Sequence, residues 1–216
     1  AGGVYQLYVQ AVCANDTSSY IGPFTVIMPL ANDTVCSAEM LTVDGPVYTF
    51  NNTGATVSTG ETAIAPPTTG AQTTDGWINS VLNNTTWFTF VAPASGNIRI
   101  NNTAINYAGQ TAVYEALLCN DFNTFNFVAG NDNAIGGTSN ASNFTVCGLT
   151  PGNTYYLMHD GNTGTVGNYS INITSINLEA GSFVDVLDVC TGDTVNLFDG
   201  ITGYQANGTW SAELAS

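Results

Sequence analysis

The segment "WFTFVAPASGNIRINNT", residues 87–103, decides the fold class. It carries two alternating segments, WFTFV and NIRI, on either side of the turn sequence APASG. Successive side chains of a strand point to opposite faces, so Trp87 lies on the face opposite to Phe88 and Phe90. A strand that is apolar on both faces is covered on both sides. The segment therefore predicts two adjacent strands of a β-sandwich, joined as a hairpin, with Arg99 on the exposed face of the second.

The composition fits a folded domain with an unusual surface. The 216 residues are 44% hydrophobic and 11% aromatic, which is enough to fill a core. Sixteen acidic residues stand against one Arg and no Lys, giving a net charge of −15, yet only 8% of residues are charged. Binding to nucleic acid or to an anionic membrane needs basic side chains, so we exclude both partners and expect cations instead. No segment approaches the roughly 20 apolar residues that cross a bilayer, so we expect no membrane insertion.

Turn sequences separate many short strand candidates, and almost no helical periodicity is present. Examples of the turn sequences are NNTG, PASG, TPGN and DGNTG. This pattern predicts an all-β protein. The predicted strands span residues 5–12, 24–28, 47–50, 86–91, 97–101, 112–118, 125–130, 143–146, 154–159 and 167–173.

Three motifs in the middle of the chain occur in an order that resembles a known family. They are ANDTVCSAEMLTVDGPVYTFNNTGATVSTGE, TTWFTFVAPASGNIRINNT and VCGLTPGNTYYLMHDGNTGTVGNYSINI. Residues 31–176 thereby resemble the bacterial pre-peptidase C-terminal domain, which is found on secreted peptidases and surface adhesins. The resemblance implies a jelly-roll-like antiparallel β-sandwich. The chain departs from the family in YEALL, where a tighter aliphatic strand is more usual, and in GETAIAPPTTGAQTTDGWINS, which lacks the Cys often found there and leaves Cys36 without that partner.

The two ends resemble parts of other β modules. YQLYVQAVCANDTSSYIGPFTVIMP, within residues 1–30, is similar to the last two strands of a fibronectin type III domain. VDVLDVCTGDTVNLFDGITGYQANGTW, within residues 177–216, is similar to the first strands of Ig-like repeats in giant surface proteins of the Bacteroidetes. Both resemblances imply partial β modules at the ends of the chain, which would make it a window of a longer array.

Five cysteines are spread along the chain without a CxxC pair, and only one His accompanies them. A zinc site or a redox dithiol is therefore disfavoured, and disulfides in an oxidising compartment fit better. We expect Cys119 to pair with Cys147, closing a loop of about 28 residues worth roughly 3 kcal/mol in the chain-entropy model. No partner is assigned to Cys13, Cys36 or Cys190, and an odd count leaves at least one thiol unpaired within the chain.

Acidic and amide residues in loops make Ca²⁺ the expected cofactor, because Ca²⁺ takes six to eight oxygen ligands. The candidate ligands are Asp33 with its neighbour Asn32, Glu61, Asn131, Asp132 and Asp160. The family resemblance favours Glu61 and Asp132, since some members bind Ca²⁺ through acidic residues in these segments. The spacing does not match an EF-hand. The alternative is that these residues only cap turns through Asx hydrogen bonds.

Catalysis is disfavoured. A Ser-His-Asp set would need His159 as its base, because the chain has no other His, and no G-x-S-x-G elbow is present. We expect His159 to be packed beside Tyr156 or exposed at a strand end. Among sixteen acids a pair of carboxylates at glycosidase spacing arises by chance, so such a pair indicates nothing.

Two further features bear on the surface. Asp-Thr-Val occurs at Asp33 and at Asp193 and resembles the O-glycosylation signal of Bacteroidetes, which makes Thr34 and Thr194 candidate glycosylation sites. The Asn-x-Ser/Thr sequons arise readily in a chain this rich in Asn and Thr. Trp77, Trp87 and Trp210 are either stacking platforms for a glycan or, more in keeping with their size, core residues.

These observations favour a non-catalytic adhesive or structural module of a long secreted or cell-surface protein, of the adhesion or gliding type. Its partners would be neighbouring modules of the same chain, surface glycans or other copies of itself, and its location extracellular or on the outer cell surface. One alternative is an accessory domain of a secreted hydrolase. A second is an extracellular filament subunit that exchanges strands with its neighbours.

Overall fold

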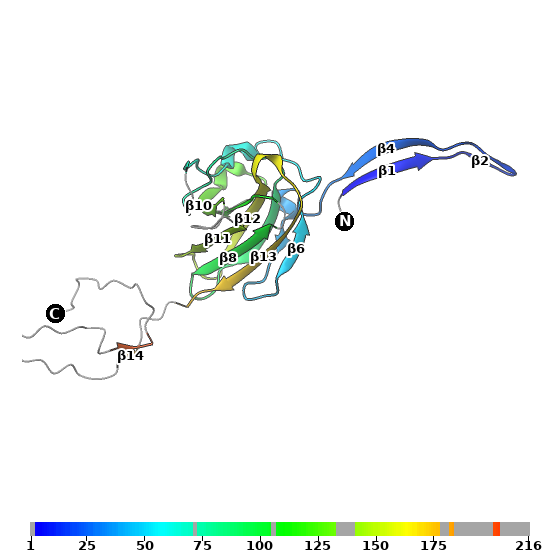
Figure 1. Cartoon of the computed structure of the whole chain (residues 1–216). Helices are drawn as coiled ribbons and strands as arrows, with labels where there is room; N and C mark the ends of the chain where they lie inside the picture. Colours follow the sequence, from blue (N-terminus) through cyan, green and yellow to red (C-terminus); the bar gives the residue numbers. More distant parts are fainter. Residues whose placement is uncertain are drawn as a thin grey trace, which may run out of the picture. The chain divides into compact units, whose positions relative to one another are not determined.

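A computed structural model describes residues 3–70, 73–104, 107–132, 141–177, 182–183 and 201–203. It divides into two compact units, residues 1–175 and 176–216. The first unit contains a β-sandwich and a separate N-terminal hairpin (Figure 1). In the second unit, β14 (Ser182–Phe183) pairs with β15 (Ile201–Thr202). No helix in the described ranges is long and apolar enough to cross a membrane.

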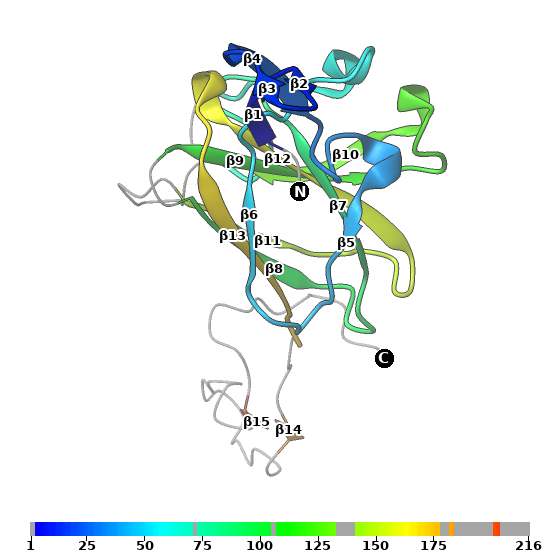
Figure 2. The same ribbon diagram turned by 90° about the vertical axis from the view of Figure 1, so that its right-hand side faces the viewer.

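Two sheets form the sandwich, and Figure 2 shows them as two layers. The first sheet has the order β10 (Asn126–Asn131), β9 (Gly109–Glu115), β12 (Thr154–Gly161), β7 (Thr86–Val91) and β5 (Glu39–Met40). The second has the order β11 (Ala141–Val146), β8 (Ile98–Ala104), β13 (Asn168–Ser175) and β6 (Tyr48–Asn51). All pairings are antiparallel except β5 with β7. The predicted all-β class is confirmed, and each of the ten predicted strands overlaps an observed one.

The predicted hairpin between residues 86–91 and 97–101 is wrong. β7 pairs with β12 and β5 in the first sheet, whereas β8 pairs with β11 and β13 in the second. The linking residues 92–97 carry the chain from one layer to the other and are held by the residue 149–153 segment, through bonds from the Ala92 N–H to the Asn153 carbonyl and from the Leu149 N–H to the Gly96 carbonyl. A link of this length spans the roughly 10 Å between stacked sheets.

The apolar alternation of β7 serves two separate clusters. Phe88 and Phe90 lie between the sheets, in the main core with residues such as Ile100, Leu157 and Ile171. Trp87 faces away from that core, into a second cluster that contains Trp77, Tyr114 and Met158. Loop segments and short 3-10 helices cover this outer cluster: η1 (Val35–Ser37), η2 (Glu61–Ile64) and η3 (Phe122–Thr124). The prediction that β7 is covered on both faces is confirmed, because Trp87, Phe88 and Phe90 are all 0% exposed.

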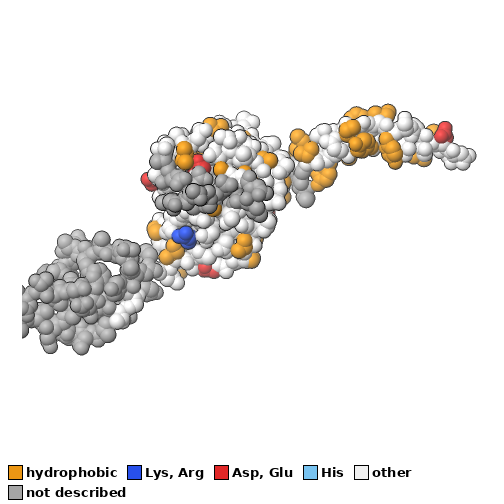
Figure 3. Space-filling model, viewed as in Figure 1, with side chains coloured by type: hydrophobic (Ala, Val, Ile, Leu, Met, Phe, Trp, Pro, Cys, Tyr) orange, Lys and Arg blue, Asp and Glu red, His pale blue; other side chains and the backbone are white. Residues whose placement is uncertain are grey.

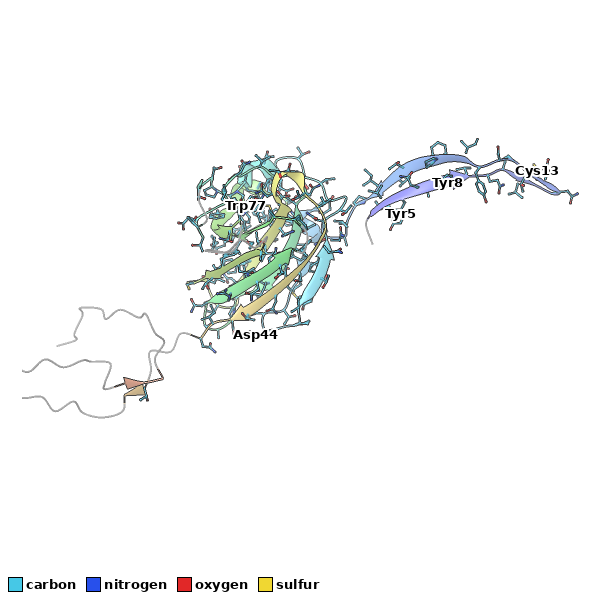
Figure 4. The ribbon with its side chains drawn as sticks, viewed as in Figure 1. Tyr5, Tyr8, Cys13, Asp44 and Trp77 are labelled. Atoms are coloured by element: carbon cyan, nitrogen blue, oxygen red, sulfur yellow. A yellow bond between two sulfur atoms is a disulfide. The ribbon has the colours of Figure 1, made fainter. Side chains whose placement is uncertain are left out.

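Two features close the ends of the sandwich. A fourth 3-10 helix, η4 (Asn162–Gly164), links β12 to β13. Asp44, labelled in Figure 4, lies at the end of β13, where its carboxylate accepts bonds from the N–H and the hydroxyl of Ser175. Its backbone N–H also donates to the carbonyl of Ile173. Asp44 therefore fixes the last residues of β13, next to the boundary between the two units.

The N-terminal hairpin pairs β1 (Gly3–Val9) with β4 (Ile21–Met28), and its tip pairs β2 (Val12–Cys13) with β3 (Asp16–Thr17). It shares no strand pairing with the sandwich. One of its faces is apolar throughout and includes the directly opposed and half-exposed Leu7 and Phe24. The other face carries the hydrogen-bonded pair Gln6 and Thr25 at its centre. A face of this kind is typical of a sheet that packs on a second layer.

Candidate functional site

Asp33 and Glu61 are buried carboxylates whose oxygens are all bonded to the chain itself. Asp33 accepts the N–H of Thr56 at 2.6 Å and the Thr56 hydroxyl at 2.8 Å. Glu61 accepts the N–H of Ser58 at 2.7 Å and the indole N–H of Trp87 at 3.0 Å. Burial raises the pKa of Glu61, and its hydrogen bonds oppose that rise. Both residues therefore anchor the loop of residues 52–64 over the outer cluster, and each of their carboxylate oxygens already accepts a bond from the chain.

Asp160 lies at the end of β12 and is 0% exposed. Its carboxylate accepts four bonds, from the backbone N–H groups of Asn83, Asn84 and Gly161 and from the side-chain amide of Gln110. Burial raises its pKa to about 6, against the effect of these donors. The Asp160 carboxylate thus holds residues 83 and 84 against the end of the first sheet.

Asp132 differs from the other buried acids because one of its oxygens is unused. Its Oδ2 accepts the N–H of Ile78 at 3.3 Å, whereas its buried Oδ1 has no hydrogen-bond partner. Burial raises its pKa to about 6, against the opposing effects of the Ile78 N–H and of the Asn162 side chain. The nearby Gln110 leaves its Oε1, and Asn131 its Oδ1, without a partner.

These unused oxygens come from neighbouring positions of adjacent strands. In the antiparallel register of β10 and β9, Asn131 pairs with Thr111. Asp132 and Gln110 are the next residues along these two segments, and Gln110 also pairs with Asp160 of β12. All the unused atoms here are acceptors, which suits a cation or a water molecule. The fit to Ca²⁺ is therefore partial: Asp132, Gln110 and Asn131 offer free oxygens, whereas Asp33, Glu61 and Asp160 do not. No group of three or more His, Cys, Asp or Glu side chains that could hold a metal ion occurs within the described ranges.

His159 is fully buried in a polar layer between the sheets. Its Nδ1 lies 2.6 Å from the amide nitrogen of Asn102, and its Nε2 lies 2.8 Å from the hydroxyl of Tyr107. With Asn102 donating, Nδ1 accepts and Nε2 carries the proton. The ring stacks on Tyr169 at a centroid distance of 3.8 Å. Burial lowers its pKa to about 3, so the imidazole is neutral at physiological pH.

The surroundings of His159 differ in detail from the expectation. Tyr156 is not its neighbour, because the two residues are three apart in β12 and point to opposite faces, and Tyr156 packs on Phe125 instead. The described ring contacts of His159 are with Asn102, Tyr107 and Tyr169, and none of these is a serine or cysteine nucleophile.

The predicted Cys119–Cys147 disulfide is wrong. Cys119 is bonded to Cys36, with a Cα–Cα distance of 5.0 Å, while Cys147 and Cys13 are free and exposed. Cys119 lies in the loop that covers the outer face of the first sheet, beside η1, whereas Cys147 follows β11 in the second sheet. The two sulfurs therefore belong to different layers. Cys190 lies outside the described residues.

The remaining predicted positions divide between core, surface and undescribed segments. Trp77 and Trp87 are both 0% exposed, and the indole of Trp77 donates to the carbonyl of Thr111, so neither can stack on a ligand from solvent. Trp77, labelled in Figure 4, belongs to the outer cluster. Thr34 is exposed at the start of η1, where its hydroxyl lies 2.7 Å from that of Ser37, and its glycosylation stays a prediction. Thr194 and Trp210 lie outside the described residues.

Comparison with known proteins finds likeness among solved structures. No family model matches the sequence, and no curated protein matches it. Among solved structures, the pre-peptidase C-terminal domain of a collagenase from Bacillus anthracis is similar at 14% sequence identity and a TM-score of 0.35. The match covers 63% of this chain and 93% of that domain.

Proposed function

We propose that the chain is a non-catalytic structural and adhesive module of a secreted or cell-surface protein, of the adhesion or gliding type found in Bacteroidetes-like bacteria. One observation carries the proposal: the buried side chains that could take part in catalysis are hydrogen-bonded within the chain and hold the sandwich together. His159 is neutral and enclosed by Asn102, Tyr107 and Tyr169, and Asp160 accepts four bonds from the chain. A group committed in this way does not face a substrate.

The disulfide supports an extracellular location. Disulfides persist in oxidising environments and are rare where thiols are kept reduced. The Cys36–Cys119 bond ties the first covering helix to the loop after β9, across 83 residues of sequence. A cross-link of this kind suits a module that must stay folded outside the cell.

The hairpin supports the proposal that residues 1–30, 31–176 and 177–216 belong to three successive modules. A two-stranded hairpin is marginally stable alone, and this one has a wholly apolar face. We propose that a further β layer, carried by a neighbouring module of the same protein, covers that face. The exposed hydrophobic side chains of the hairpin are visible in Figure 3.

Antibodies against residues 31–175, applied to intact cells that make the native protein, test the location. We expect labelling of unpermeabilised cells and loss of that labelling after protease shaving. Latex beads coated with the chain should adhere to the native substratum of those cells better than beads coated with albumin. Labelling only after permeabilisation, or equal adhesion of both kinds of bead, would contradict the proposal. Purified native protein that cleaves peptides or glycosidic bonds would favour the hydrolase accessory domain instead.

A further inference from the structure

The outward face of the second sheet consists mainly of uncharged polar side chains and carries a single charged one. The inward residues of β8, β11 and β13 are buried between the sheets, so the alternate residues of these strands point outward. The registers place the outward residues in rows across the sheet. One row is Asn143–Asn101–Asn172, and the next is Thr145–Arg99–Thr174. Adjacent members of a row belong to neighbouring strands, roughly 4.8 Å apart.

Charge is segregated on the sandwich. Nine of the sixteen acids lie between residues 31 and 175, but none of them is an outward residue of the four strands of this sheet. The acid at its margin, Asp44, is bonded to Ser175. Arg99 is the only basic residue of the 216, and it stands in the second of these rows on this acid-free face. In Figure 3 it is the only blue side chain, on a largely white surface.

Arg99 is exposed and presents its free end to solvent. Its Nε donates to the side-chain oxygen of Asn101 at 3.1 Å, which orients the guanidinium over the row of asparagines. No carboxylate within the described ranges pairs with it, and its two terminal nitrogens donate to none of the described residues. A guanidinium with both terminal nitrogens free matches a planar carboxylate in a bidentate pair.

We propose that this face binds an acidic polysaccharide, a polyhydroxylated chain that carries carboxylates. A sugar carboxylate pairs with the terminal nitrogens of Arg99, while the side-chain groups of the two rows that remain accessible exchange hydrogen bonds with ring hydroxyls. The Asn172 amide nitrogen, which donates to the Gly45 carbonyl, and the buried Oδ1 of Asn143 are not among them. The inference rests on the proposed adhesive function and names its partner. Elsewhere on a chain of net charge −15 an anionic polymer is repelled, so the acid-free face is where it can approach.

The face has the character of a weak site. A single exposed ion pair contributes little binding free energy. The described part of the face also has no aromatic side chain on which a sugar ring could stack. Affinity per module is therefore low, and strong adhesion requires several modules acting together on one polymer.

The test measures binding of the 216-residue chain to surfaces coated with polygalacturonate or with neutral dextran, by biolayer interferometry at about 0.15 M salt, which screens the long-range repulsion between the acidic chain and the polymer. EDTA is present throughout, so that Ca²⁺ cannot bridge acids of the protein to the polymer. The variants are Arg99→Gln, which removes the charge; Arg99→Lys, which keeps the charge and loses the fork; and Asn143→Ala, which removes one amide of the row. The matched control is Asn126→Ala, an exposed asparagine on β10 in the other sheet.

We expect binding to polygalacturonate and not to dextran. Arg99→Gln should weaken it roughly threefold to tenfold, the range of one charge-assisted contact, with Arg99→Lys in between. Asn143→Ala should weaken binding measurably, and Asn126→Ala should leave it unchanged. Equal binding of the wild type and Arg99→Gln, equal binding to both polymers, or binding that appears only without EDTA would overturn the inference. If bead adhesion persists in Arg99→Gln, this inference fails while the adhesive function stands; if the wild-type chain adheres nowhere, both fail.

Discussion

At the scale of single residues, alternation predicts which way a side chain points but not what it meets. The opposite directions of Trp87 and Phe88 follow from the strand pattern alone, and both directions are confirmed. The partners of His159 come from β8, β13 and the segment before β9, up to 57 residues away in sequence. No local pattern encodes contacts over such separations. The same holds for Asp160, whose donors lie on Asn83 and Asn84.

The buried imidazole of His159 should make stability depend on pH. Its pKa falls from 6.5 to about 3 because burial disfavours the charged form. Below about pH 6.5 His159 binds a proton in the unfolded chain but not in the folded chain. The folded state is therefore most favoured above that pH, and its free energy of unfolding decreases as the pH falls. Between about pH 7.5 and about pH 5, the wild type should lose about 2 kcal/mol more unfolding free energy than His159→Gln.

Urea denaturation of both proteins at a series of pH values measures this difference. What is compared is the pH dependence of the unfolding free energy in the two proteins. Burial raises the pKa values of Asp132 and Asp160 to about 6, so these two acids favour the folded state at lower pH and oppose the effect of His159. Both proteins retain these two acids, so their contribution cancels. Parallel curves for the wild type and His159→Gln would show that His159 is not the buried neutral group described.

Asp132 is where we expect Ca²⁺ to act. Its Oδ1 is free, and Gln110, one position beyond the Asn131–Thr111 pair, also has a free amide oxygen, whereas both oxygens of Asp33 are bonded to Thr56. Ca²⁺ at ten times its dissociation constant should stabilise the chain by about 1.4 kcal/mol, and EDTA should reverse the effect. Thermal unfolding with and without Ca²⁺ gives this increment for each variant.

Two substitutions locate the site. The increment should vanish in Asp132→Asn and persist in Asp33→Asn, although Asp33→Asn lowers stability in both conditions by breaking the bonds to Thr56. An increment that survives Asp132→Asn, or no increment in the wild type, would remove Ca²⁺ from this site.

At the scale of elements, the strands could be predicted and their pairing could not. Each of the ten apolar segments became a strand because alternation and turn residues act locally. Which strands pair depends on the path of the linkers. Residues 92–97 look like a hairpin turn, but bonds to residues 149–153 hold them in place as a crossing between layers. β5, only two residues long and parallel to β7, has no sequence signal of its own.

The disulfide shows the same limit. Proximity in sequence favours Cys147 as the partner of Cys119, but the fold brings Cys36 to it from 83 residues away. A longer loop loses more entropy when closed, so the observed bond stabilises the chain by about 4–5 kcal/mol in the chain-entropy model. Replacing both residues, Cys36→Ser with Cys119→Ser, should therefore lower the free energy of unfolding by about that amount, as measured in urea.

Cys147→Ser is the matched control, because this thiol is free and exposed. We expect it to change the unfolding free energy by less than about 0.5 kcal/mol. Equal losses in the two proteins would mean that Cys147 is bonded in solution. A negligible loss in the double variant would mean that the Cys36–Cys119 bond does not constrain the unfolded chain.

At the scale of the whole molecule, the sandwich is complete within residues 31–175. Its two sheets take strands only from β5 to β13, and neither β1–β4 nor β14 and β15 contributes one. Asp44 accepts two bonds from Ser175, so the end of β13 is held by a contact that also falls inside this range. The two apolar clusters and the disulfide stabilise the sandwich. We therefore expect its free energy of unfolding to be nearly the same with and without the two ends of the chain.

A fragment of residues 31–175 should accordingly fold alone and unfold in one cooperative transition, within a few degrees of the sandwich transition in the 216-residue chain. Differential scanning calorimetry of the two proteins makes the comparison. A second fragment that ends at residue 174 is the control, because it keeps the strand pairing of the core apart from the terminal Ser175–Ile98 pair and loses the two bonds between Asp44 and Ser175. It should melt lower than the 31–175 fragment, by an amount that corresponds to about 1–2 kcal/mol for two exposed hydrogen bonds to a carboxylate. If the 31–175 fragment fails to fold, the sandwich depends on one of the flanking segments, and the division into three modules must be abandoned.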